Sequence, residues 1–224
     1  MNLGKAAELL EEAEICLKLF KNRQTLDDAR AETEGFEEEF AEEYAKLLAE
    51  LEREMAAAET EEELDEIRGR FMAAATALMS KRLRRRMARA VRLAWQGAMD
   101  DVELSELLTA RDMLAVEAVD ASFTPRLRDA SAVEKESLVQ KLAAIGSYGM
   151  LYAGMIWAGF WTSRVISGPP DATYRWGGTI DEATCVDCME RIGEEYTKDA
   201  LPGMPGDQST VCDGRCRCFL FEIR

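Results

Sequence analysis

Five of the six cysteines lie in the last fifty or so residues, and the chain of 224 residues contains no histidine. Cys185 and Cys188 form a Cys-x-x-Cys pair, and Cys212, Cys216 and Cys218 follow about two dozen residues later. Two thiolates at this spacing can bind one tetrahedral metal ion, and a second group of thiolates completes the coordination. The pattern predicts a structural zinc site.

Turn-forming residues separate the two cysteine groups, namely Gly193, Pro202-Gly203 and Pro205-Gly206. Such residues reverse the chain and can bring the second group back to the first. A segment this short buries little apolar surface, whereas zinc contributes on the order of 10–16 kcal/mol to the folding of small zinc peptides. We therefore expect residues 169–224 to form a zinc-stapled module of turns and short strands.

Other states of these cysteines stay open. Disulfides are the main alternative, although five is an odd number and we expect no signal peptide to direct the chain to an oxidising compartment. A redox-active Cys-x-x-Cys pair usually follows a strand in a βαβ pattern, which this sequence lacks, and inert cysteines rarely cluster so closely. A catalytic zinc is disfavoured, because an all-thiolate site is closed and open sites normally use His or a carboxylate with water.

Five thiols compete for four ligand positions. Cys185 and Cys188 are the secure pair. The tail from Cys216 alternates like a strand, so Cys216 and Cys218 point to the same side, and Cys212 competes with one of them. We predict that Cys185, Cys188, Cys212 and Cys216 bind the metal and that Cys218 is the alternate ligand, but the sequence leaves this choice open.

A longer pattern surrounds the cysteines, consisting of Trp176, Thr184-Cys185-Val-Asp-Cys188, Gly193, Leu201-Pro202-Gly203, Cys212 and Cys216-Arg217-Cys218. Over about residues 145 to 224, it resembles the C-terminal region of tailed-phage minor head proteins, the Mu-type head-morphogenesis family. Many members have a histidine two residues before the closing Cys-Arg-Cys, where this chain has Cys212 nearby instead. That departure leaves the exact ligand equivalence open.

The resemblance implies a non-catalytic component of the virion or procapsid that is added near the portal during head assembly. Its expected partners are the portal protein, the major capsid protein or both, and several copies are expected in each particle. The expected location is the virion, and the host cytoplasm during assembly.

Charge is unevenly distributed along the chain. The formal net charge of −15 argues against a surface that generally coats nucleic acid. Residues 1–66 carry 22 acidic and 7 basic side chains, whereas residues 67–99 carry 9 basic and no acidic ones. An acidic N-terminal part therefore precedes a basic block.

The N-terminal part has the periodicity of long amphipathic helices. Apolar residues recur at spacings of three and four in a seam formed by Leu3, Ala6, Leu10, Ala13, Leu17 and Phe20. We expect a break near Asn22 and Thr25-Leu-Asp-Asp, and then a second helix from about Glu34 to Ala58. Thr60 and Glu63 form a capping box that predicts the start of a third helix.

The basic block runs from Lys81 to Trp95, and its charged residues are Lys81, Arg82, Arg84, Arg85, Arg86, Arg89 and Arg92. On a helix they surround an apolar strip. Three interpretations compete: pairing with the acidic N-terminal helices, contact with DNA phosphates, and binding to an anionic membrane. Pairing with the acidic helices is the simplest interpretation, because the acidic excess of residues 1–66 supplies carboxylates for the basic side chains.

Further helices are predicted toward the C-terminus. One extends from about Val102 to Phe123 and is interrupted at Thr124-Pro125. Ser131 and Glu134 have the form of a second capping box, which opens the longest apolar run of the chain.

Leu142 to Trp161 is twenty residues without a formal charge, just long enough to span a bilayer. Four glycines reduce the hydropathy of this run, and a glycine-rich helix needs close neighbours to be stable. We favour a buried central helix, and a membrane-inserting segment is the alternative.

Together these features predict a mostly α protein, with a multi-helix body over residues 1–168 and the zinc module over residues 169–224. Without histidine, the usual general base near neutral pH is missing, and no nucleotide-binding glycine motif is present, so we expect no enzymatic activity. We expect a structural phage head protein. The alternatives are a nucleic-acid-binding zinc protein that uses residues 81–95 and a membrane-active phage protein that uses residues 142–161.

Overall fold

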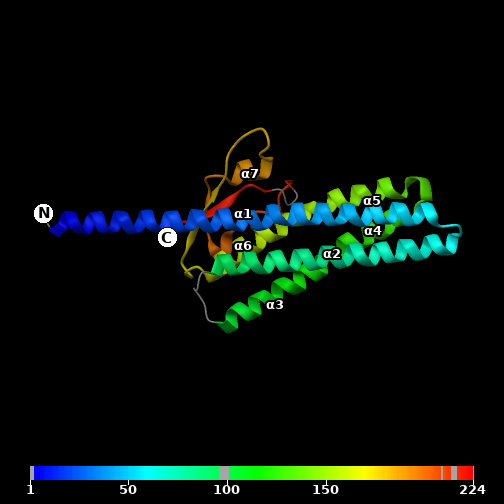
Figure 1. Ribbon diagram of the computed structural model, residues 1–224. Coiled ribbons are helices and arrows are strands. Elements are labelled where there is room, and N and C mark those ends of the chain that lie inside the picture. The colour runs from blue at the N-terminus through cyan, green and yellow to red at the C-terminus, as the bar shows by residue number, and fades with distance from the viewer. Residues whose placement is uncertain (1–2, 96–100, 208, 213–215, 224) are drawn as a thin grey trace.

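The computed structural model describes residues 3–95, 101–207, 209–212 and 216–223, and among them the side chains from residue 24 onward except at positions 101 and 136. The chain is mostly helical, and the strands in the described part lie within its last quarter (Figure 1). The predicted fold class, a mostly α body with a small C-terminal module of turns and short strands, is confirmed.

The body is a bundle of helices built on one long hairpin. Helices α1 (Leu3–Ala57) and α2 (Glu61–Trp95) run side by side in opposite directions (Figure 1). The remaining helical elements of the body are α3 (Asp101–Ala118), the π-helical turn η1 (Val119–Phe123), α4 (Thr124–Ser131), α5 (Lys135–Gly149), the 3-10 turn η2 (Met150–Tyr152) and α6 (Ala153–Ser167). Helix α6 packs against both α2 and α1.

The predicted capping box at the tip of the hairpin is present. The hydroxyl of Thr60 accepts a hydrogen bond from the backbone N–H of Glu63, and the Glu63 carboxylate accepts one from the N–H of Thr60. The same carboxylate also accepts from the N–H of Glu59, which lies just before the helix. These bonds pair the free N–H groups at the start of α2.

Two predicted helix boundaries are wrong. Helix α1 continues without a break through Asn22 and Thr25, because Thr25 is buried against the body and Asp28 accepts a hydrogen bond from Gln24 one turn earlier. Ser131 does not cap α5; it is the last residue of α4, and its hydroxyl donates to the carbonyl of Arg128. The residue in the cap position of α5 is Glu134.

The expected interruption at Thr124-Pro125 takes the form of a change in helix type. The π-helical turn η1 comes directly before it, and Pro125 lies in the first turn of α4. Proline is tolerated in a first turn because its missing N–H would have no partner in the helix.

The long apolar run forms the end of α5, the turn η2 and most of α6. Among the described residues, one stretch, Ser137–Ser167, is apolar and long enough to span a membrane, and 56% of its most apolar window is buried. The core helix of a globular protein meets the same criterion. Because α6 is buried along most of its length, the structure favours the core interpretation.

The glycines of this run permit the close packing that the sequence predicts. A Cβ atom on Gly146 would lie 2.6 Å from the ring of Tyr44, and one on Gly149 would lie 2.5 Å from Phe40. Both aromatic rings belong to α1 and are buried. Glycine therefore allows α5 to approach α1 closely.

The C-terminal module contains a three-stranded antiparallel sheet in the order β2-β1-β3. Its strands and helical turns are β1 (Thr173–Gly177), α7 (Val186–Arg191), β2 (Glu195–Thr197), the 3-10 turn η3 (Lys198–Ala200) and β3 (Phe219–Glu222). The central strand β1 carries the buried residues Tyr174 and Trp176, which belong to the same hydrophobic core as the helices.

Several contacts fasten the module to the body. The indole N–H of Trp157 in α6 donates to the carbonyl of Cys218 at 2.8 Å, and Arg30 in α1 donates to the carbonyl of Arg217. The buried Gly206 lies so close to α6 that a Cβ on it would be 2.6 Å from the carbonyl oxygen of Gly154. The module is therefore held on the surface formed by α1 and α6.

Candidate metal centre

The first cysteine pair is positioned by the start of α7. Cys185 is the residue before the helix, and its sulfur accepts a hydrogen bond from the backbone N–H of Cys188 at 3.4 Å. A cysteine sulfur in the cap position turns back toward the first helical turn, as an Asp or Ser oxygen does. Both sulfurs of the Cys-x-x-Cys pair are therefore directed to the same side of α7.

The returning chain is held in place by two aspartates. Asp187, between the first two cysteines, accepts a hydrogen bond from the backbone N–H of Val211 at 2.8 Å. Asp207 accepts from the N–H groups of Met204 and Ser209 and so closes the preceding turn. Gly203 in this turn has a φ of 138°, which favours glycine. These bonds place Cys212 next to the first cysteine pair.

All five thiols of the module converge on one small space. The sulfur atoms of Cys185, Cys188 and Cys212 lie within 4.8 Å of one another, and so do those of Cys188, Cys216 and Cys218. The five cysteines are not joined by disulfides. They surround a cavity of about 20 Å³, which is the size of an ion rather than of an organic ligand. The cluster could therefore hold a metal ion.

The thiol chemistry of the cluster fits a soft metal ion. Tetrahedral zinc with four thiolates at about 2.3 Å requires sulfur–sulfur distances of about 3.8 Å, and the Cys188 and Cys216 sulfurs are 3.6 Å apart. The predicted ligands Cys185, Cys188 and Cys212 form one group, and Cys216 lies next to Cys188 in the other. Cys218 is also within reach, so the identity of the fourth ligand stays a prediction.

The proximity of the thiols moves their pKa values apart. The neighbouring Cys216 thiol lowers the pKa of Cys218, an effect that Trp176 and Arg217 reinforce. Interaction with Cys218, together with burial, raises the pKa of Cys216. Burial raises the pKa of Cys188. A bound cation would displace the thiol protons, because the metal-binding form of cysteine is the thiolate.

Arg217 closes the loop that covers the cluster. Its guanidinium donates to both carboxylate oxygens of Asp181, at 2.9 and 2.5 Å. This bidentate contact lowers the pKa of Asp181 to about 2. Asp181 also accepts a hydrogen bond from the hydroxyl of Thr184, the residue before Cys185. The cysteine pattern alone predicts no role for Asp181 or Asp187, although their positions near Cys185 and Cys188 in the sequence are the signal that could have identified them.

The structure pairs much of the basic block with acidic residues of the body. Contacts with carboxylates of α1 are made by Arg82 (Glu39 and Glu43), Arg86 (Glu32 and Glu39) and Arg89 (Glu32), and Arg84 contacts Asp112 of α3. Lys81, Arg85 and Arg92 are exposed and form no ion pair within the described part of the chain. Internal pairing therefore accounts for four of the seven predicted contact residues.

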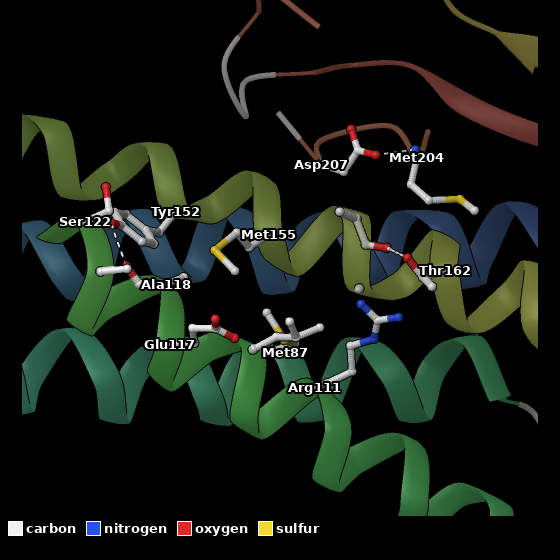
Figure 2. A pocket seen from close by; sticks show the side chains of 14 residues that line it. Met87, Arg111, Glu117, Ala118, Ser122, Tyr152, Met155, Thr162, Met204 and Asp207 are labelled. Atoms are coloured by element: carbon white, nitrogen blue, oxygen red, sulfur yellow. Dashed lines mark hydrogen bonds between the residues drawn. The ribbon is translucent and has the colours of Figure 1, made fainter. Parts of the chain in front are cut away.

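A second, larger cavity of about 580 Å³ lies between α2, α3, α6 and the loop of the module that carries Met204 and Asp207. Figure 2 shows Met87 and Met155 facing this space and Arg111 pointing into it from α3. The Nε of Arg111 is buried and has no hydrogen-bond partner among the described residues, and burial lowers its pKa. No local sequence pattern predicts this cavity, because its walls come from separate segments of the chain.

The comparisons with known proteins identify no relative of this chain. No protein-family model matches the sequence, and no significant match occurs among the curated proteins or the solved structures.

Proposed function

We propose that this protein is a structural component of a tailed-phage head, in which a zinc-stapled module acts as a rigid docking element on a helical body. The observation that carries the proposal is the convergence of five thiols from two segments, which accompanies the Cys-x-x-Cys and Cys-Arg-Cys pattern of the Mu-type head-morphogenesis family. The proposed partners are the portal protein, the major capsid protein or both.

The proposed role of the zinc ion is structural. Four cysteine thiolates would fill a tetrahedral coordination shell and leave no position for water or substrate. The ion would cross-link α7 to the segment that leads into β3. This cross-link would stabilise a module whose strands are only three to five residues long. Arg217 and Asp181 would close the loop beside it.

The surface of the module supports a docking role. Four large apolar side chains are exposed on the segments around the cysteines, namely Ile180, Val186, Met189 and Val211. Contiguous exposed apolar patches are typical of protein–protein contact sites, and these four side chains would contribute to such a patch. A metal-fixed backbone would present them without the entropic cost of ordering a loop.

Metal analysis of the native protein tests the structural part of this proposal. We expect one zinc per chain by mass spectrometry under native conditions. We also expect chelation to lower the melting temperature and to remove the dispersion of amide signals from residues 173–222. A protein that contains no metal when purified, and whose module keeps its structure after chelation, would contradict the proposal.

The assembly role needs a separate test in the phage that encodes the chain. We expect the tagged wild-type protein to sediment with procapsids, and the Cys188→Ser variant to remain in the soluble fraction. A Cys16→Ser variant is the matched control, because Cys16 lies outside the module. If both variants sediment like the wild type, the module does not act as the docking element.

The second candidate function is phosphate-backbone binding by α2. Lys81, Arg85 and Arg92 are exposed, and their spacings of four and seven residues place them on one face of the helix. A gel shift with duplex DNA distinguishes this function, since binding through about three phosphates weakens steeply and predictably with added salt. Retention of DNA that does not change with salt would argue against it.

A further inference from the structure

The segment that carries Cys216 and Cys218 is attached to the helical body through its backbone. The indole N–H of Trp157 in α6 donates to the carbonyl of Cys218 at 2.8 Å, and Arg30 in α1 donates to the carbonyl of Arg217 at 3.2 Å. These two carbonyls belong to the peptide planes on either side of the Cys218 Cα atom. Because each peptide plane is rigid, the two bonds restrict the backbone dihedral angles of Cys218 and hence the directions that its side chain can take.

The turn that precedes Cys212 rests on the same part of α6. Gly206, six positions before Cys212, is buried and has a φ of 88°, which favours glycine. A Cβ on Gly206 would lie 2.6 Å from the carbonyl oxygen of Gly154 and 3.3 Å from Cδ1 of Trp157. Trp157 therefore lies beside both segments that bring the second cysteine group to the first.

Trp157 is itself held in one orientation by its neighbours. It is 3% exposed, its ring stacks on Phe160 with the ring centroids 5.7 Å apart, and it meets Trp161 edge to face at 5.6 Å. The guanidinium of Arg30 lies 5.5 Å from the Trp157 ring centroid, so the two donors to the cysteine segment also contact each other. The body thus presents a fixed pair of hydrogen-bond donors to this segment.

We propose that Trp157 and Arg30 are positioning residues of the metal centre, so that the helical body sets the affinity of the cysteine cluster for its metal ion. The inference rests on the metal site proposed above but does not depend on the phage assignment. When the ligands of a site come from distant segments, part of the binding free energy is used to order those segments. Here α1 and α6 order one segment in advance, whichever of Cys216 and Cys218 is the fourth ligand.

Thermodynamic linkage makes this effect reciprocal. If the fixed carbonyl of Cys218 favours metal binding, the bound metal favours the bond between that carbonyl and Trp157 by the same factor. We therefore expect the indole proton of Trp157 to exchange with solvent more slowly in the zinc-loaded protein than in the metal-free protein. Trp161 is the internal reference, because its indole N–H has no hydrogen-bond partner among the described residues.

Zinc titrations of the full-length protein against a competing chelator test the proposal. Trp157→Phe keeps an aromatic ring but leaves the buried carbonyl of Cys218 unpaired, so we expect the zinc affinity to fall by about fivefold or more. Trp161→Phe is the matched control, because it makes the same change at a residue of the same exposure one turn later in α6 and removes an unpaired donor. The control should stay within about twofold of the wild type.

The absorption spectrum of the cobalt(II)-loaded protein separates positioning from a general loss of stability. A displaced sulfur ligand changes the ligand field of the bound ion, whereas lower stability with an intact site does not. We expect altered visible bands in Trp157→Phe and a wild-type spectrum in Trp161→Phe. If these two variants have the same zinc affinity and the same cobalt(II) spectrum, the positioning role is wrong and the metal site itself stands. A wild-type protein that binds neither ion would overturn both.

A second pair of variants decides the question if Trp157→Phe does not fold. Arg30 is exposed, so Arg30→Met should keep the fold while removing the donor to the carbonyl of Arg217, and we expect the zinc affinity to fall about twofold to fivefold. Arg53→Met is the control, since Arg53 is an exposed arginine of the same helix that pairs with Glu50. Equal zinc affinity in this pair would then refute the proposal.

Discussion

The sulfur atoms of Cys188 and Cys216 lie 3.6 Å apart, although 28 positions separate the two residues in the sequence. This distance is far longer than a disulfide bond of about 2.05 Å and close to the separation of two thiolates on one tetrahedral zinc ion. It brings the start of α7 next to the segment that leads into β3. A metal ion bound at this point would connect both ends of the module.

Serine substitutions will identify the four ligands. We expect Cys188→Ser to abolish metal binding, because Cys188 belongs to both groups of neighbouring thiols. Cys216→Ser should lose the metal to a competing chelator at least tenfold more readily than the wild type, whereas Cys218→Ser should retain one zinc per chain. The metal-to-protein ratio during chelator titration measures both. The reverse result for Cys216 and Cys218 would make Cys218 the fourth ligand.

Arg86 should be the most important arginine of the basic block for stability. Its guanidinium contacts Glu32 and Glu39 at 2.7 Å each, and its side chain is 11% exposed. Arg86→Ala removes one of two cations from each carboxylate, because Arg82 also contacts Glu39 and Arg89 also contacts Glu32, so we expect a loss of about 1–3 kcal/mol in the free energy of unfolding. Arg85→Ala is the matched control and should change it by less than about 0.5 kcal/mol. Urea denaturation of both variants measures the difference, and equal effects would contradict the assigned role.

Two glycine-to-alanine substitutions should have opposite effects. A Cβ on Gly149 would lie 2.5 Å from Phe40 and 2.8 Å from Met79, so Gly149→Ala forces α5 away from α1 and should destabilise the protein by about 1–3 kcal/mol. Gly69 in α2 has no atom within 4 Å of the same position. Gly69→Ala should therefore stabilise the protein by about 0.5–1 kcal/mol through helix propensity. Thermal unfolding of the two variants tests this pair, and destabilisation by Gly69→Ala would be inconsistent with the open surface at that position.

The Asp181–Arg217 pair should make the stability of the module depend on pH in the acidic range. Arg217 lowers the pKa of Asp181 to about 2, against an ordinary value of 3.8. Because the pKa is lower in the folded state, the stabilisation is fully present above about pH 4 and is lost as the pH falls through about 2. Arg217→Met should move the Asp181 pKa back toward 3.8. Carboxyl-carbon NMR titration measures it, with Arg175→Met, which removes the partner of Glu195, as the control. An unchanged Asp181 pKa in Arg217→Met would show that the pair does not form in solution.

Local and periodic patterns in the sequence determined much of this protein. Thr60 with Glu63 predicted the start of α2, because these residues are three positions apart. The short spacings within each cysteine group, with turn residues between the groups, predicted one thiol cluster. The glycine-rich apolar run predicted a helix that needs close neighbours, and Gly146 and Gly149 have them. These features require only the geometry of a turn or a helix.

Other features were decided by the tertiary structure alone. Helix α1 passes through Thr25 without a break because burial against the body outweighs a weak local preference. The partners of Arg86 depend on which elements pack together, and no local pattern encodes that. The choice of the fourth ligand also lies beyond local sequence patterns, because Cys216 and Cys218 are two positions apart and the sulfurs of both lie within 4.8 Å of that of Cys188.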